Sequence, residues 1–179
     1  FTRILSSVKT SDAKIIPELS EPPLKNLKAF QNAWRQLTCK WQYSRKAVTQ
    51  ELKSPALDGR PYGALKPDPN NPAMTKRDIK IHTLVERMDQ YLNSSGGGFP
   101  LFNDFIKFTG SYLSQKTKKN QTPPQHTFFD FCDGIYGCAE ALRADFDEYI
   151  LYLKTQIFRF ANTELPKRKT KKNINFFDD

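Results

Sequence analysis

The residues of this chain with the clearest potential chemistry are lysines and arginines, which gather in three groups along the sequence. One group lies on a predicted helix, one in a loop between helices, and one in the last fourteen residues. Lys and Arg side chains contact phosphate oxygens, and such contacts give an affinity that depends on salt and not on base sequence. The pattern predicts a nucleic-acid-binding surface made of Lys25, Lys28, Arg35 and Lys46, of Lys116, Lys118 and Lys119, and of Lys167, Arg168, Lys169, Lys171 and Lys172.

The overall charge also favours an anionic partner. The 179 residues carry 28 Lys and Arg against 19 Asp and Glu, a formal net charge of +9. Such an excess favours nucleic acid, an anionic lipid surface or an acidic protein. Two alternatives stay open: the charges only keep the surface hydrated, or the chain is a helical interaction module for an acidic partner. We expect no membrane contact, because Trp34 and Trp41 fall on the apolar face of their helix.

Residues suited to catalysis or metal binding are sparse. His82 and His126 are not spaced as metal ligands, and the sequence has no Cys-x-x-Cys pair. His126 precedes a helix start, so a capping or packing role is expected, and Cys132 and Cys138 are interpreted as structural. We therefore expect no catalytic residue, no metal site and no cofactor in this segment. Five acids are interpreted as a solvated helix face: Asp130, Asp133, Asp145, Asp147 and Glu148.

Two long helices are expected to position the basic groups. Apolar residues at steps of three and four predict a helix over 24–53, interrupted only by Arg45, whose stem is expected to lie along an apolar surface. A second long helix is predicted from Thr127 to about Asn162 or Glu164. Its seam, expected to pack against other helices, is Phe128, Cys132, Ile135, Ala139, Leu142, Phe146, Tyr149, Leu153, Ile157 and Phe160.

Shorter helices and long loops complete the expected fold. Thr75 and Asp78 resemble a capping box that opens a helix ending at Asn93, and a short aromatic helix is expected within 102–112. The three valines are too few for a large sheet. We expect an all-α fold: an irregular helical bundle with two long helices and long Pro- and Gly-rich loops, forming a single subdomain over 1–179. The expected loops lie near 54–74, 94–98 and 114–126.

The two long helices carry opposite charge. The first, over 24–53, has seven Lys and Arg, including Lys53, against one acid, whereas residues 127–165 have three against seven. These opposite fields favour packing of the two helices side by side, although an exposed ion pair contributes only about 0–1 kcal/mol.

Cysteine usage and hydropathy indicate the compartment. The cysteines, Cys39, Cys132 and Cys138, are odd in number and lack the spacing of a disulfide framework, which favours a reducing, cytoplasmic environment. No stretch approaches the roughly 18 apolar residues of a transmembrane helix, and no signal peptide is evident near the start.

The terminal segment carries the most specific motif. A run Glu-Leu-Pro-Lys-Arg-Lys over 164–169 leads into Phe-Asp-Asp over 177–179, and this stretch resembles RecB-type superfamily 1 DNA helicases, the beta subunits of exodeoxyribonuclease V. The part around Pro123-Pro-Gln-His126, with Phe128-Phe129 and Cys132-Asp133, is also similar to that family. The first 90 residues show no such similarity by eye.

The resemblance implies that the chain is an internal piece of a larger enzyme, consistent with a first residue Phe1 in place of Met. The piece would be the 1B insertion subdomain, an arm near duplex DNA ahead of the fork. The Walker motifs, ATP, Mg and the nuclease site would belong to other parts of the parent, an ATP-dependent helicase and exonuclease of double-strand break repair and recombination. The piece alone is expected to be inactive. Implied partners are duplex DNA and the other subunits of the exodeoxyribonuclease V complex.

Overall fold

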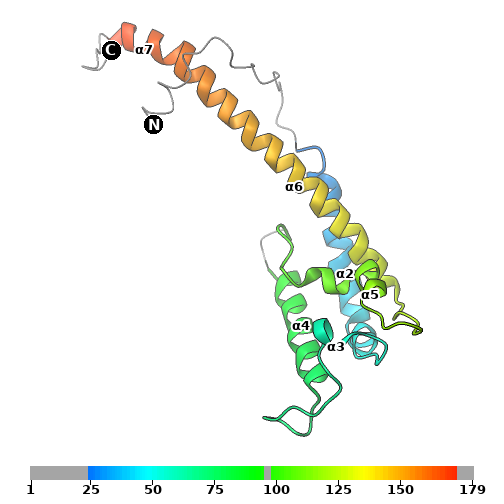
Figure 1. The fold of residues 1–179 in the computed structure, drawn as a ribbon. Helices are drawn as coiled ribbons and strands as arrows, with labels where there is room; N and C mark the ends of the chain where they lie inside the picture. The colour runs from blue at the N-terminus through cyan, green and yellow to red at the C-terminus, as the bar shows by residue number, and fades with distance from the viewer. Residues whose placement is uncertain (1–23, 95–97, 173–179) are drawn as a thin grey trace. The chain divides into compact units, whose positions relative to one another are not determined.

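The computed structural model describes residues 24–94 and 98–172, apart from the side chains of Leu165, Lys169, Lys171 and Lys172. The described residues form helices and loops with two isolated β-bridges and no sheet, which confirms the all-α prediction (Figure 1). The elements are α2 (Leu27–Leu52), α3 (Gly59–Tyr62), α4 (Lys76–Leu92), the 3-10 helix η1 (Phe105–Phe108), α5 (Gly110–Gln115), α6 (Thr127–Arg159), the π-helical segment η2 (Phe160–Glu164) and α7 (Leu165–Lys172).

The chain divides into two compact units. Residues 25–144 form one unit, and the described residues of the other are 24 and 145–172. The first unit holds α2 to α5 and the beginning of α6, whereas the second holds the rest of α6 together with η2 and α7. The organisation as a single subdomain remains a prediction.

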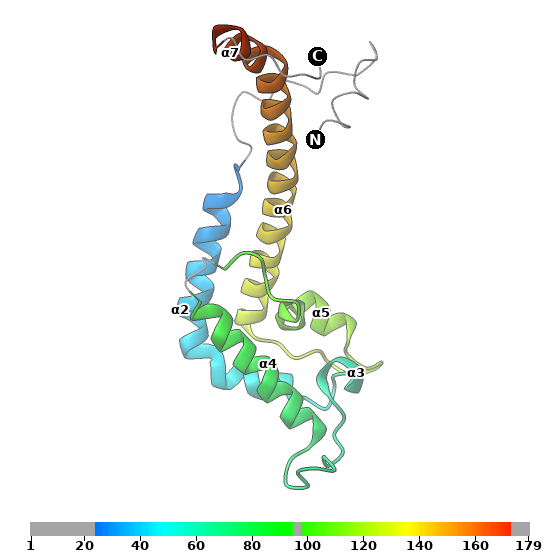
Figure 2. The same ribbon diagram turned by 90° about the vertical axis from the view of Figure 1, so that its left-hand side faces the viewer.

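The first unit is built around α2 and α4, which pack against each other in opposite directions (Figure 2). The predicted capping box opens α4: Oγ1 of Thr75 accepts from the backbone N–H of Asp78 at 3.1 Å, and Oδ2 of Asp78 accepts from the backbone N–H of Thr75 at 3.1 Å. These reciprocal bonds satisfy two backbone donors that a bare helix start would leave without partners. Both α2 and α4 begin and end within three residues of their predicted bounds.

Aromatic rings fill the core of this unit. The ring of Trp41 on α2 lies 5.9 Å from that of Phe108 on η1 and 5.0 Å from that of Phe128 on α6. Each fully buried large apolar side chain contributes about 1.5–3 kcal/mol of transfer free energy. The core also contains buried Leu37, Val48, Leu52, Ile81, Val85, Met88, Phe105, Phe129 and Leu142.

A buried arginine orders the predicted 54–74 loop. Arg77 is 1% exposed, and its guanidinium donates to the carbonyl oxygens of Gly63 at 2.9 Å and Leu57 at 2.8 Å, and also to that of Ser54. Desolvation lowers the pKa of Arg77. Three carbonyls on one rigid guanidinium fork hold the first half of the loop against α4. Gly63 adopts a φ of +88°, and a Cβ there would lie 2.7 Å from Cα of Arg77.

Ion pairs connect α2 to α4. Arg45 lies against Asp89 rather than along an apolar surface as predicted: its Nε lies 3.0 Å and its Nη2 2.7 Å from Oδ2 of the carboxylate. Lys53 forms the second pair, with Nζ 2.8 Å from Oδ1 of Asp78. The contact between α2 and the start of α6 is aromatic, because Trp41 meets Phe128 there and Lys40 lies 4.3 Å from the ring centre of Phe131.

The seam of α6 is buried only over its first part. Phe128, Cys132, Ile135, Ala139 and Leu142 are buried as predicted, but Leu153 is 41%, Ile157 57% and Phe160 42% exposed. The prediction of a fully packed seam is therefore wrong at Leu153, Ile157 and Phe160, which the described residues of the chain leave exposed. The α-helix widens into the π-helical turn of η2 just before Pro166. Proline has no backbone N–H and so cannot donate a hydrogen bond to the fourth residue before it.

Candidate nucleic-acid interface

Three predicted cations share the outer face of α2. Lys28, Arg35 and Lys46 are exposed and lie seven and eleven residues apart, which is two and three turns of an α-helix. At 1.5 Å per residue their Cα atoms are about 10 and 16 Å apart along the axis. The buried residues Leu37 and Trp41 occupy the opposite side of the helix. We call Lys28, Arg35 and Lys46 the cationic face of α2; Lys25 is exposed in the turn that precedes the helix.

The cationic face is free of acid. Glu51 is the only acidic residue of α2, and it is half-buried. Arg45 and Lys53 pair with Asp89 and Asp78, but both carboxylates belong to α4. No carboxylate within residues 24–94 and 98–172 pairs with the three cations of the face. The positions between them hold neutral, exposed side chains, namely Gln31, Asn32, Gln36, Cys39, Gln42 and Tyr43.

The charge of the first unit agrees with this local arrangement. Residues 25–144 hold 18 Lys and Arg against 10 Asp and Glu. A surface with an unbalanced positive field attracts polyanions over about one Debye length, roughly 10 Å at 0.1 M salt.

The loop lysines are partly engaged in holding the loop. Nζ of Lys118 donates to the carbonyl of Pro55 at 2.8 Å, and Nζ of Lys116 lies 5.3 Å from the ring centre of Tyr112. An isolated bridge between Leu57 and Thr117 fixes the same loop. Lys118 and Lys119 are exposed, whereas Lys116 is half-buried. Within this group Lys119 is the residue most open to a ligand.

The terminal basic group belongs to the second unit. Nζ of Lys167 lies 3.0 Å from Oε1 of Glu164, and the guanidinium carbon of Arg168 lies 5.1 Å from the ring centre of Phe160. Lys169, Lys171 and Lys172 lie on α7, but their side chains are outside the described part, as are Asp178 and Asp179. This group and the cationic face of α2 thus belong to different units of the chain.

Several of the residues considered for catalysis are buried or form hydrogen bonds within the fold. Nδ1 of His126 accepts from the backbone N–H of Phe128 at 3.0 Å, which confirms a capping role. Cys132 is buried, and burial raises the pKa of its thiol. Two acids differ from the predicted solvated face: Asp133 accepts a 2.5 Å hydrogen bond from the hydroxyl of Ser111, and Asp145 is buried. No group of three or more metal-binding side chains occurs in the described residues.

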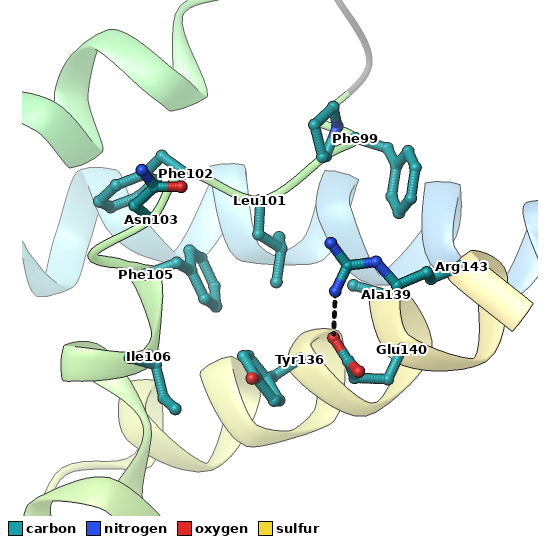
Figure 3. Close-up of a pocket in the computed structure, with 11 residues that line it drawn as sticks. Phe99, Leu101, Phe102, Asn103, Phe105, Ile106, Tyr136, Ala139, Glu140 and Arg143 are labelled. Atoms are coloured by element: carbon teal, nitrogen blue, oxygen red, sulfur yellow. Dashed lines mark ion pairs between the residues drawn. The ribbon is translucent and has the colours of Figure 1, made fainter.

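A small cavity of about 190 Å³ opens between the 99–106 segment and α6 (Figure 3). Leu101 points into it from the segment and Tyr136 from α6, and Arg143 extends across its rim toward Glu140, with a 3.7 Å ion pair between them. The charged groups of the rim thus neutralise each other. Its lining mixes apolar side chains with Asn103, Tyr136 and the Glu140–Arg143 pair, and it places no nucleophile beside a base.

A second group of cations was missed by sequence reasoning. Lys76, Lys80 and Arg87 lie on one face of α4, and Lys107 of η1 lines the same groove. The sequence signal that could have revealed them is their spacing: Lys76, Lys80 and Arg87 follow one another at four and seven residues, which places them on one face of a helix. The groove itself could not be found from sequence, because its other wall comes from Pro61, Asp68 and the 104–107 segment, which lie outside α4 in the chain.

Comparison of the chain with protein-family models, curated proteins and solved structures finds no match. Among the described residues, none of the helices combines the length and the hydropathy that crossing a membrane requires.

Proposed function

We propose that this chain is an accessory, 1B-like subdomain of an ATP-dependent DNA helicase and exonuclease of the exodeoxyribonuclease V type, and that it contacts the backbone of duplex DNA. The parent enzyme would act in the cytoplasm in double-strand break repair and recombination. The observation that carries the proposal is the cationic face of α2, with Lys28, Arg35 and Lys46 exposed in line and no acid among them.

This face is suited to phosphates and not to base edges. Phosphate contacts by Lys and Arg position a protein on DNA but carry no sequence information. The neighbouring Gln and Asn side chains can add hydrogen bonds to phosphate and sugar oxygens. A rigid helix that presents cations over about 27 Å can follow the backbone of a duplex without deforming it. Sequence-independent contact is therefore expected.

ATP and Mg belong to the motor of the parent enzyme in this proposal. The sequence has no Gly-Lys-Ser or Gly-Lys-Thr phosphate loop, so none of its residues is assigned to hold a nucleotide. The chain by itself is expected not to hydrolyse ATP.

Contact with other subunits has separate support. Ile150, Leu153 and Ile157 follow one another at helical spacing on α6, and they are 49%, 41% and 57% exposed. A row of exposed large apolar side chains is typical of a surface that another protein covers. In this proposal the rest of the parent enzyme or another subunit covers it.

The salt dependence of duplex binding tests the proposal. Three phosphate contacts predict a slope of log K against log salt of about −2.7 for duplex DNA. The triple variant Lys28→Gln, Arg35→Gln, Lys46→Gln should lose most of that slope. The control Lys66→Gln, Arg143→Gln, Lys154→Gln removes the same charge elsewhere and should keep the slope. A wild-type affinity that does not change with salt would contradict the proposal.

An acidic protein is the alternative ligand of the same face. Polyglutamate distinguishes the two, because it carries carboxylates at peptide spacing and no phosphodiester backbone. If polyglutamate competes with duplex DNA at equal charge concentration, the interaction-module alternative is favoured.

A further inference from the structure

A groove runs along the face of α4 that points away from α2. Its first part has a volume of about 440 Å³, between α4 on one side and Pro61, Asp68 and η1 on the other. The second part, of about 550 Å³, shares Arg87 and Asp104 with the first and continues past the end of α4. From Lys76 to Tyr91 the groove follows about 23 Å of α4, and Ser94 lies beyond the end of the helix.

The first part of the groove is cationic. Lys76, Lys80, Arg87 and Lys107 line it, against the two carboxylates of Asp68 and Asp104. Both Arg87 and Lys107 pair with Asp104, and the distance from Nζ of Lys107 to Oδ1 is 2.7 Å. Hydrogen bonding by Lys107 is the largest cause of a lowered pKa of Asp104.

Two lysines of the groove have no carboxylate partner among the described residues. Nζ of Lys80 donates to the backbone carbonyl of Arg60 at 2.8 Å, and Lys76 is exposed with no ion pair within residues 24–94 and 98–172. Oδ1 of Asp68 accepts from the backbone N–H of Asn70 at 2.9 Å. Lys76 and Lys80, one turn apart on α4, thus form a place for an anionic group.

The second part of the groove is aromatic and neutral. Tyr91 and Phe102 line it, and their ring centres lie 5.3 Å apart. Both rings are half-buried, so each keeps some surface open to the groove. Asn103, which lines the same part, is exposed and supplies amide donors and acceptors.

We propose that this groove binds a single strand of nucleic acid, with phosphates at Lys76, Lys80 and Arg87 and a base against Tyr91 and Phe102. A positive groove that continues into aromatic rings is the common arrangement for single strands, because each base offers a face for stacking. Lys107 and Asp104 are recessed, with side chains 19% and 24% exposed, so a flexible strand reaches them more easily than a stiff duplex does. The groove deepens the nucleic-acid function proposed above, on which it rests.

Its position gives the first unit two separate nucleic-acid surfaces. The cationic face of α2 is opposite that helix's core side, and the groove is on the side of α4 opposite Asp78 and Asp89, which face α2. A duplex on α2 and a single strand on α4 can therefore be bound by one unit at the same time.

Fluorescence anisotropy with the full chain, using a 12-nucleotide thymidine strand and a 20-base-pair duplex, tests the groove. The variant Lys76→Gln, Lys80→Gln should weaken single-strand binding at least tenfold, flatten its salt slope by about 1.4, and leave duplex binding unchanged. Asp104→Asn should tighten single-strand binding several-fold, because it frees Arg87 and Lys107. The control Lys66→Gln, an exposed lysine that does not line the groove, should change neither affinity.

A measurement on the wild-type chain makes the test independent of variant folding. Single-strand DNA should slow amine labelling of Lys76 and Lys80, and a strand without bases should protect them less. Equal protection by polyglutamate would overturn the proposal in favour of an acidic protein segment. Single-strand binding without protection at Lys76 would also overturn it, even if the duplex still binds. If single-strand DNA protects Lys76 and Lys80 but the wild-type chain does not bind duplex DNA, the groove proposal stands and the function proposed for α2 is contradicted.

Discussion

Trp41 Nε1 donates a 2.7 Å hydrogen bond to Oδ1 of Asp89, across the contact between α2 and α4. Arg45 holds the same carboxylate from the exposed side. Burial alone raises the pKa of Asp89, but the bonds from Arg45 and Trp41 outweigh it, so the pKa is lowered overall. This carboxylate, together with the Lys53–Asp78 pair, connects the two helices that carry the cationic face and the groove.

Asp89→Ala should therefore destabilise the first unit. The substitution leaves the indole N–H of Trp41, a residue only 4% exposed, without a partner and removes the ion pair of Arg45. We expect a loss of about 2 kcal/mol in the free energy of unfolding, or about 4 to 8 °C in Tm. Thermal unfolding followed by circular dichroism measures it. Glu86→Ala, which removes an exposed acid nearby on α4, should shift Tm by less than a degree or two.

Stability should fall in acid through Asp78. Hydrogen bonds from Lys53 and Thr75 lower the pKa of Asp78 to about 2, below the value near 3.9 expected for the unfolded chain. Between these two values the unfolded chain binds more protons than the folded state, so stability falls as the pH drops from about 4 to about 2. Urea unfolding midpoints at pH 6, 4 and 2.5 test this. In Asp78→Asn the loss should be smaller, and an equal loss in both proteins would contradict the assignment.

Arg77→Met should unfold the chain more readily than any surface substitution. It leaves the carbonyls of Ser54, Leu57 and Gly63 without their donor. At about 1 kcal/mol or more for each buried acceptor, we expect a loss of about 3 kcal/mol. Chemical denaturation gives the value. Arg60→Met, an exposed arginine of the same loop region, provides the control and should be close to neutral.

Adding one acid to the cationic face should weaken duplex binding. Gln42 is exposed one turn before Lys46, so Gln42→Glu creates an i,i+4 pair that neutralises Lys46 without removing it. We expect a loss of about threefold to tenfold in duplex affinity at low salt and no loss of Tm. Gln121→Glu, in the exposed loop before α6, adds the same charge elsewhere and should have a smaller effect on affinity.

Local signals in the sequence were sufficient for the helices. The Thr75–Asp78 capping box and the apolar spacing of α2 act within a few residues, so the pattern predicts them closely. Apolar periodicity does not show whether another element covers the apolar face of a helix. The seam of α6 was therefore predicted to be buried at Ile157, whereas this residue is 57% exposed.

Partnerships between distant residues could not be predicted. Arg45 was predicted to lie along an apolar surface and Arg77 carried no prediction, because Asp89 and the carbonyls at 54–63 approach them only after the chain folds. The same reason hid the groove on α4, whose cations are close in sequence but whose second wall, including Asp104, is not.

In the proposed function, duplex DNA lies on the outer face of α2. Cys39 is exposed on that face, four residues after Arg35 and seven before Lys46, whereas Cys132 is buried and Cys138 half-buried. It therefore offers a chemical probe within the proposed contact in the unmodified sequence.

The most direct measurement is the rate at which a small thiol reagent alkylates Cys39 with and without duplex DNA. We expect that saturating duplex slows alkylation at least fivefold in low salt, and that raising the salt restores the free rate as the DNA dissociates. An unchanged rate at Cys39, with the duplex shown to be bound, would place the DNA elsewhere and contradict the claim.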